Sequence, residues 1–381
     1  MSAKSKKVAI GILGVTAIVL TAALLFVGNR LGIVSCSDRS ALEGRGFNPD
    51  FAIAVIMTSD QKPLTYIDYY DEDLNLLASL EYPYLSARSP WGLPAIHDGV
   101  VFMTPRGKSI LPNSSFVAAL DMATGEVTEY DADGGVSNVA ANDRYIFAAA
   151  QGGFGRIDRE SGEVLSVDLD GRVFPFAYED RLYVFNDMQN LPDEDDTKLL
   201  IYDVESLELI EEIFFGPQTA VYPITGFIGN RLYFIFAPDR DATSSTGLRN
   251  YLSFYSVEDA QIHDLLTDSG MRLYYVASIE GLLFVLATEI QSEDNIFQRL
   301  LIVDAETGEI KSVYPFDYFP LFILSSGNTL YIGGVNQNYA SIIHSYIPDG
   351  DSILETGSIE LVIHDVKGAR YGIGGLFAPG E

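Results

Sequence analysis

The sequence has a single cysteine, a single tryptophan and fewer than half as many basic as acidic residues. Because Cys36 is alone, no internal disulfide can form, and the fold must be stable through packing. Lysine and arginine number 24 against 53 aspartates and glutamates, a net charge of −29 over 381 residues. A field of that sign repels phosphate backbones, so we expect no nucleic-acid partner. Hydrophobic residues still make up 48%, which excludes wholesale disorder.

One long hydrophobic run lies at the N-terminus and determines the expected location. Residues 1–7 (MSAKSKK) are polar and basic, and residues 8–28 contain no charged side chain. A helix of that length spans the ~30 Å hydrocarbon core of a bilayer. Because the positive charge precedes the run, the N-terminus should stay in the cytoplasm and the remainder should lie outside. We therefore predict a transmembrane anchor at 8–28, or a signal sequence, followed by a linker at 29–50 on a single-pass protein of the cell membrane.

A second mode of attachment is suggested by residues 33–36, Ile-Val-Ser-Cys. This segment resembles the lipobox of bacterial lipoproteins, in which the cysteine becomes the lipidated first residue of the mature chain. The resemblance makes Cys36 a lipidation candidate. Asn29 and Arg30 separate it from the hydrophobic run, whereas in lipoproteins the box normally closes that run. The two alternatives, an uncleaved anchor or a lipid anchor after cleavage before Cys36, both place the body outside the cytoplasm.

The remaining chain is built from two recurring sequence patterns. In the first, a polar pair precedes a short run rich in aliphatic residues, Tyr and Phe; copies begin at Asp98, Asp143, Asp180, Asn230, Glu280 and Asn328. The second reads Asp-x-x-[Thr/Ser]-Gly-Glu-aliphatic. Its clear copies contain Asp121, Asp158 and Asp304, and its degenerate copies lie near residues 71, 203, 256 and 347. Seven copies at a mean spacing of about 46 residues are typical of β-propeller blades.

The chemistry of the second pattern is that of a turn between two strands. The aspartate caps the backbone, the hydroxyl supports it, and the glycine takes a conformation with positive φ. We therefore predict that residues 51–381 form a single all-β propeller, with seven four-stranded blades as the best count. The first blade, beginning at Phe51, lacks its innermost strand. A strand-like segment at 369–377 should supply it and close the ring.

These repeats resemble those of the PQQ-like (quinoprotein-type) β-propeller superfamily. That superfamily contains quinone-dependent dehydrogenases and many non-catalytic extracytoplasmic propellers, including the lipoprotein of the outer-membrane β-barrel assembly machinery. In the dehydrogenases each repeat typically carries a tryptophan shortly after the glycine. The stretches after Gly125, Gly162 and Gly308 contain none. This departure counts against a quinoprotein enzyme, and the resemblance therefore implies a non-catalytic, membrane-anchored or lipoprotein-like member with no cofactor.

We find no pattern that predicts a catalytic, cofactor-binding or metal-binding residue. The four histidines, His97, His263, His344 and His364, show no metal-ligand spacing, and neither a P-loop nor a Gly-x-Ser-x-Gly elbow occurs. The acidic segments Pro192–Asp196 and Asp131–Gly135 are interpreted as a solvated loop and a turn, and Asp239–Gly247 as a candidate contact loop. A set of aromatic residues is expected at innermost strands or blade boundaries, mainly for packing between blades, with a ligand-stacking role at the mouth of the central channel as the alternative. These residues are Phe174, Phe176, Tyr178, Tyr222, Tyr274, Tyr275, Tyr314, Phe316, Tyr318 and Phe319.

Three functions remain open on the sequence. The favoured hypothesis is a membrane-tethered, non-catalytic binding or scaffold protein whose partner is another protein or a small ligand. The alternative is a propeller oxidoreductase, lyase or hydrolase with a site at the central channel. A third is a structural envelope protein of a salt-rich habitat, whose acidic surface serves only solvation. An enzyme should gather titratable groups with perturbed pKa values at the channel, whereas a scaffold should expose an apolar patch at a face or edge.

Overall fold

The computed structural model describes residues 50–87, 94–109, 115–150, 152–187, 197–215, 220–237, 250–267, 270–292, 295–361, 364 and 371–379. The predicted cytoplasmic segment 1–7, the predicted anchor 8–28, nearly all of the linker 29–50 and Cys36 lie outside these ranges. Within them, a search for a helix long and apolar enough to span a bilayer finds none. The described ranges contain strands and turns only.

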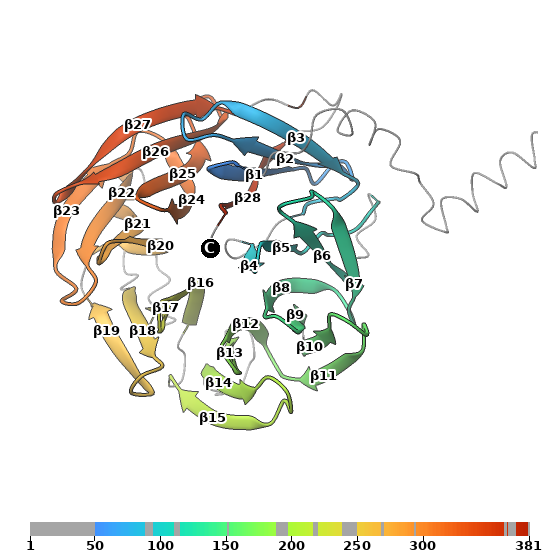
Figure 1. The fold of residues 1–381 in the computed structure, drawn as a ribbon. Coiled ribbons are helices and arrows are strands. Elements are labelled where there is room, and N and C mark those ends of the chain that lie inside the picture. Colours follow the sequence, from blue (N-terminus) through green and yellow to red (C-terminus); the bar gives the residue numbers. More distant parts are fainter. Residues whose placement is uncertain are drawn as a thin grey trace, which may run out of the picture. The chain divides into compact units, whose positions relative to one another are not determined.

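In the described ranges, twenty-eight strands form seven four-stranded antiparallel sheets, which surround a common axis as the blades of a propeller (Figure 1). Blade 1 consists of β28 (Gly372–Phe377), β1 (Ile53–Thr58), β2 (Thr65–Tyr70) and β3 (Leu76–Tyr82). Blade 2 consists of β4 (Ala95–His97), β5 (Val100–Met103), β6 (Phe116–Asp121) and β7 (Val127–Asp131). Blade 3 consists of β8 (Val136–Ala141), β9 (Tyr145–Ala150), β10 (Gly153–Asp158) and β11 (Val164–Asp168).

The other four blades follow in chain order, each with its innermost strand first. Blade 4 consists of β12 (Arg172–Tyr178), β13 (Arg181–Asp187), β14 (Lys198–Asp203) and β15 (Leu209–Phe214). Blade 5 consists of β16 (Ala220–Ile228), β17 (Arg231–Ala237), β18 (Tyr251–Ser256) and β19 (Gln261–Leu266). Blade 6 consists of β20 (Arg272–Ile279), β21 (Leu282–Ser292), β22 (Asn295–Asp304) and β23 (Ile310–Pro315). Blade 7 consists of β24 (Phe319–Ser326), β25 (Thr329–Val335), β26 (Ser341–Asp349) and β27 (Ser352–Glu360).

The hydrophobic core lies between neighbouring blades. One cluster joins Tyr233 and Leu252 of blade 5 to Val285 and Leu301 of blade 6, and similar clusters join other neighbours. The middle strands of each blade are accordingly buried, because both of their faces meet another sheet. The outermost strands have the opposite character, as β15 shows with five of its six residues exposed.

The ring is closed by pairing of the two ends of the repeat region. β28 runs antiparallel to β1, with Ala54 opposite Phe377 and Val55 opposite Leu376. Leu376, Phe377 and Ala378 have no exposed surface. The predictions of an all-β fold, seven four-stranded blades and a closing strand near the C-terminus are confirmed.

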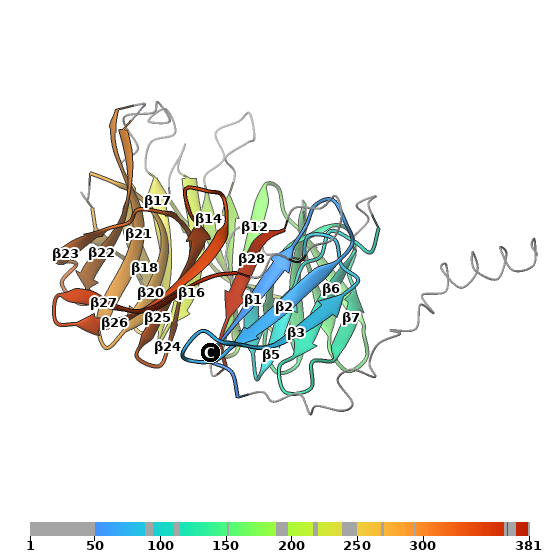
Figure 2. The same ribbon diagram turned by 90° about the horizontal axis from the view of Figure 1, so that it is seen from above.

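The connections within a blade define two faces of the ring. Because successive strands are antiparallel, the first and third connections of each blade lie on one face, which we call the turn face. The second connection and the link to the next blade lie on the opposite face, which we call the loop face. Figure 2 shows the strands running between these two faces. The acidic segment 192–196 falls between β13 and β14 in the sequence and the polar segment 239–247 between β17 and β18, and both lie outside the described ranges.

Candidate functional site

The four histidines, the sequence's potential metal ligands, lie apart and each contacts a different carboxylate. The pairs are His97 with Asp143 at 2.6 Å, His263 with Asp259 at 2.9 Å, His344 with Glu355 at 3.1 Å and His364 with Asp68 at 2.8 Å. No three histidine, cysteine or acidic side chains gather as a metal site anywhere in the part of the chain that the structure describes. The histidines thus act as local hydrogen-bond partners.

The Asp-x-x-[Thr/Ser]-Gly-Glu copies form the predicted turns on the turn face. The Oδ1 atom of Asp158 accepts hydrogen bonds from the backbone N–H of Ser161 at 2.8 Å and of Glu160 at 3.0 Å, and Gly162 follows at φ 74°. These donors, Ser161 first, lower the pKa of Asp158. The corresponding backbone N–H groups of Ser206 and Thr307 lower the pKa values of Asp203 and Asp304 in the same way. The aspartate carboxylates are therefore occupied by the turn.

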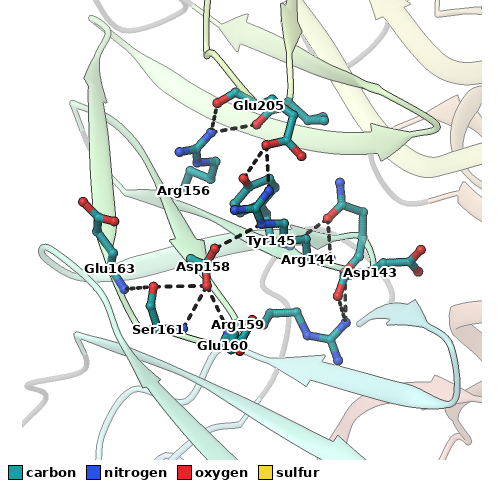
Figure 3. A network of polar contacts seen from close by, with 12 residues as sticks. Asp143, Arg144, Tyr145, Arg156, Asp158, Arg159, Glu160, Ser161, Glu163 and Glu205 are labelled. Carbon is teal, nitrogen blue, oxygen red and sulfur yellow. Dashed lines mark hydrogen bonds and ion pairs between the residues drawn. The ribbon is translucent and has the colours of Figure 1, made fainter.

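Blades 3 and 4 are joined by a polar network on the turn face (Figure 3). Arg156 of β10 is 9% exposed, and its Nη1 donates to the carbonyl oxygen of Val204 at 2.9 Å and to that of Glu205. Its guanidinium lies 4.3 Å from the centroid of the Tyr145 ring, and the Tyr145 hydroxyl donates to Glu205 Oε2 at 2.6 Å. A largely buried arginine thus satisfies backbone acceptors of the next blade.

Arg144 extends this network to the surface. Its Nη1 lies 3.0 Å from Glu205 Oε2 and its Nε lies 3.3 Å from Asp158 Oδ2, and the charge of Glu205 raises the Arg144 pKa. Arg144 and Arg156 both have protein partners, Glu205 and Asp158 for the former and the backbone of the next blade for the latter. The arrangement therefore stabilises the contact between blades.

A second polar cluster ties the closing segment to blade 1. Asp68 of β2 is completely buried. Its Oδ1 atom accepts a hydrogen bond from Ser79 Oγ at 2.5 Å, and its Oδ2 atom lies 2.8 Å from His364 Nε2. The His364 ring stacks on Tyr66 with centroids 3.7 Å apart, and burial raises the pKa of Tyr66 to about 12. Because the serine donates to the aspartate and not to the histidine, the cluster is not arranged as a nucleophile–base pair. The cluster binds His364, which precedes β28 in the sequence, to β2 of blade 1.

Most of the aromatic residues singled out in the sequence pack where two blades meet. Tyr178 stacks on Phe227 at 4.4 Å, Tyr275 lies 5.8 Å from Phe322, and Phe316 lies 5.0 Å from Tyr318. Phe174 is buried in the cluster between blades 4 and 5, and Phe176 is partly buried against that cluster. Tyr274 is partly buried against the cluster between blades 6 and 7.

Tyr314 lies in β23, the outermost strand of blade 6, and packs against the cluster between blades 6 and 7, with its ring 5.9 Å from that of Tyr346. Phe319 begins β24, the innermost strand of blade 7, but is 48% exposed. Tyr222 belongs to β16, and its side chain is outside the described part. Of the shorter acidic turn, Asp131 ends β7, and Asp133 Oδ2 accepts a hydrogen bond from Ser166 at 3.2 Å.

The exposed apolar side chains gather mainly on the outermost strands of the blades. They include Leu76 and Leu77 on β3, Leu165 on β11, Leu209, Ile210 and Phe214 on β15, Val313 on β23 and Leu354 on β27. On β15 these side chains are 49%, 49% and 56% exposed, respectively. The rim of the propeller is therefore the candidate binding surface, and β15 is its most exposed strand.

Sequence reasoning missed three features of these sites: Arg156, Asp68 and the rim. A signal existed for the first two, since each is a charged residue at an interior position of a strand, in GFGRID and TYIDYY. Burial of such a residue requires a partner. The rim had no comparable signal, because an apolar residue in an outermost strand looks the same in sequence as one in a middle strand.

Comparison with known proteins supports the fold alone. No protein-family model matches the chain, and no curated protein matches it. Among solved structures, Kluyveromyces lactis Hsv2 has a TM-score of 0.52 at 9% identity over 81% of this chain and 99% of its own. The dihydro-heme d1 dehydrogenase NirN, in complex with DHE, has a TM-score of 0.50 at 12% identity over 87% of this chain and 75% of its own. AztD from Citrobacter koseri reaches 0.48 at 12% identity over 85% and 99% of the two chains.

Proposed function

We propose that this protein is a non-catalytic binding or scaffold propeller, tethered to the cell membrane and working outside the cytoplasm. The observation that carries the proposal is the apolar rim, on which Leu77, Leu209 and Leu354 expose 47%, 49% and 54% of their surface. Exposed apolar side chains at the edge of a rigid scaffold are typical of protein-binding surfaces. The partner is another protein, and the PQQ-like repeat superfamily is the family that we propose for the chain.

The distribution of perturbed pKa values supports the same proposal. The raised values belong chiefly to tyrosines that pack within and between blades, such as Tyr275, whose pKa burial raises to about 12. The lowered values belong to turn aspartates such as Asp158, held by backbone donors. Catalytic sites instead bring several such groups to one cleft. Here the shifts follow the packing and the turns.

The binding surface can be located by site-specific photo-crosslinking in the producing cells. We expect a photoreactive residue at Leu77, Leu209 or Leu354 to give a discrete adduct with another protein, because the partner covers the rim. The same residue at Asp143, whose side chain is 93% exposed on the turn face, should give none. Adducts from Phe319 alone, near the ring axis, or from no rim position would contradict a rim-binding scaffold.

The mode of tethering is decided by the intact mass of the protein extracted from its native membrane. A mass matching residues 1–381 is expected for the anchor at 8–28. A mass matching Cys36–Glu381 plus acyl chains would replace that anchor with lipid and would favour a role in envelope assembly. A mass matching a shorter chain without acyl groups would overturn the proposed tether, while leaving the rim test unaffected.

A further inference from the structure

We propose that the free edge of β15 binds an extended segment of a partner protein that presents a basic and an apolar residue two positions apart, added to blade 4 as a fifth strand. This inference rests on the proposed binding function and names both the surface and the partner chemistry. Strand addition of this kind takes its affinity from main-chain hydrogen bonds and its specificity from alternate side chains.

The backbone geometry of β15 identifies the groups available for pairing. The N–H of Phe215 donates to the carbonyl oxygen of Thr197 at 3.0 Å, so residue 215 faces the neighbouring strand β14. Along an antiparallel strand the N–H and C=O groups alternate between the two sides. Ile213 and Glu211 therefore also face β14, opposite Leu199 and Ile201. The N–H and C=O groups of Glu212 and Phe214 point away from the sheet, toward the free edge.

The side chains beside these groups define what the partner should present. Lys198 lies 2.8 Å from Glu212 and 5.0 Å from the Phe214 ring centroid, so these three side chains share one face of the blade. A cross-strand neighbour of Phe214 gains contact if it is apolar, and a neighbour of Glu212 gains if it is basic. Glu208 and Glu211 are exposed nearby, and the strand itself contains no lysine or arginine.

Charge disfavours a second copy of this chain as the occupant. In the antiparallel register that is centred between Glu211 and Glu212, two β15 edges would bring these residues of one copy against those of the other, and like charges across strands are destabilising. The net charge of −29 adds a general repulsion between copies and a general attraction for a basic partner. The observations therefore favour a basic segment over self-association.

Other outermost strands are less suited to the same role. On β3, Leu80 and Tyr82 are buried, so its exposed stretch is short. On β7 only three of five residues are exposed, and on β27 Ile353 is buried. β15 combines exposure of five residues out of six with acidic side chains beside its free backbone groups.

The test measures binding of a fluorescent, end-blocked peptide of Lys-Thr-Val-Thr repeats to the propeller by anisotropy, because lysine and valine then lie two positions apart. We expect saturable binding that weakens with salt, and no binding of the matched peptide of Glu-Thr-Val-Thr repeats. The Glu212→Pro variant removes an outward N–H without removing a bond to β14, and we expect it to weaken binding by about tenfold. The Glu212→Gln variant removes only the charge and should weaken binding less.

The matched control lies on the neighbouring blade. The N–H of Leu169 donates to the carbonyl oxygen of Gly152, so by the same alternation Ser166 of β11 occupies the position equivalent to Glu212. The Ser166→Pro variant should leave peptide affinity unchanged, and the unfolding midpoints of all variants should be compared. Unchanged affinity in Glu212→Pro, an equal loss in Ser166→Pro, or no binding by the wild type would overturn the site. Crosslinking from other rim positions would in that case still support the scaffold function.

Discussion

Removal of the closing strand β28 is expected to abolish the folded propeller. A chain ending at Lys367 loses Leu376 and Phe377, which are fully buried, and Ile373, which is 8% exposed. Burial of each such side chain contributes about 1.5–3 kcal/mol, and a whole domain is stable by only about 5–15 kcal/mol. The truncation also leaves β1 with an unpaired edge that faces the axis of the ring. The loss of a cooperative thermal transition, followed by circular dichroism, measures the effect.

A chain ending at Ala378 is the control for this truncation. It lacks only the last three residues and keeps all of β28 together with the buried Ala378. Its unfolding midpoint should equal that of the full chain. If the chain ending at Lys367 unfolded at the same temperature as this control, ring closure would not depend on β28.

The second large effect is expected from alanine at Gly308, in the turn between β22 and β23. Gly308 has φ 71°, and a Cβ there would lie 1.9 Å from the carbonyl oxygen of Leu265, in the outermost strand of blade 5. That oxygen is backbone and cannot move aside without disturbing the contact between blades 5 and 6. We expect Gly308→Ala to lower the free energy of unfolding by about 3 kcal/mol or more, from positive φ together with overpacking. Denaturant unfolding measures it.

Gly162 provides the matched comparison, since it occupies the same position of the same turn pattern in blade 3. Its φ is 74°, and a Cβ there would meet no atom within 4 Å. Gly162→Ala therefore carries only the backbone cost, about 1 kcal/mol. The difference between the two variants isolates the contact between blades. An equal decrease in the free energy of unfolding for both variants would show that the backbone of blade 5 shifts to accommodate the added methyl group.

For these two glycines the sequence predicts the backbone conformation but not the space around it. Gly162 and Gly308 are both followed by glutamate and an aliphatic residue, and both were correctly predicted to take positive φ. The conformation of the turn depends on adjacent residues, so the sequence predicts it. The space around the turn depends on the strand of another blade, which is remote in the sequence.

The architecture was determined by the sequence itself because its signals are local and repeated. Seven turns at regular spacing predicted seven blades, and an unpaired first blade with a spare strand at 369–377 predicted the closure that β28 and β1 make. Tyr314, expected at an innermost strand or a blade boundary, lies in the outermost strand β23 and packs at the boundary with blade 7. The sequence indicated a strand around Tyr314, but not whether that strand is the innermost or the outermost of its blade.

Only the tertiary structure decided which side chains meet and which remain exposed. Asp68 and His364 are 296 residues apart, and Arg156 binds backbone 48 residues away in the next blade. Such contacts arise when blades are packed around an axis, and no period in the sequence encodes them. The same holds for β15: its apolar residues read like those of a buried strand, and their exposure follows from its place at the outer edge of blade 4, where no further sheet covers it.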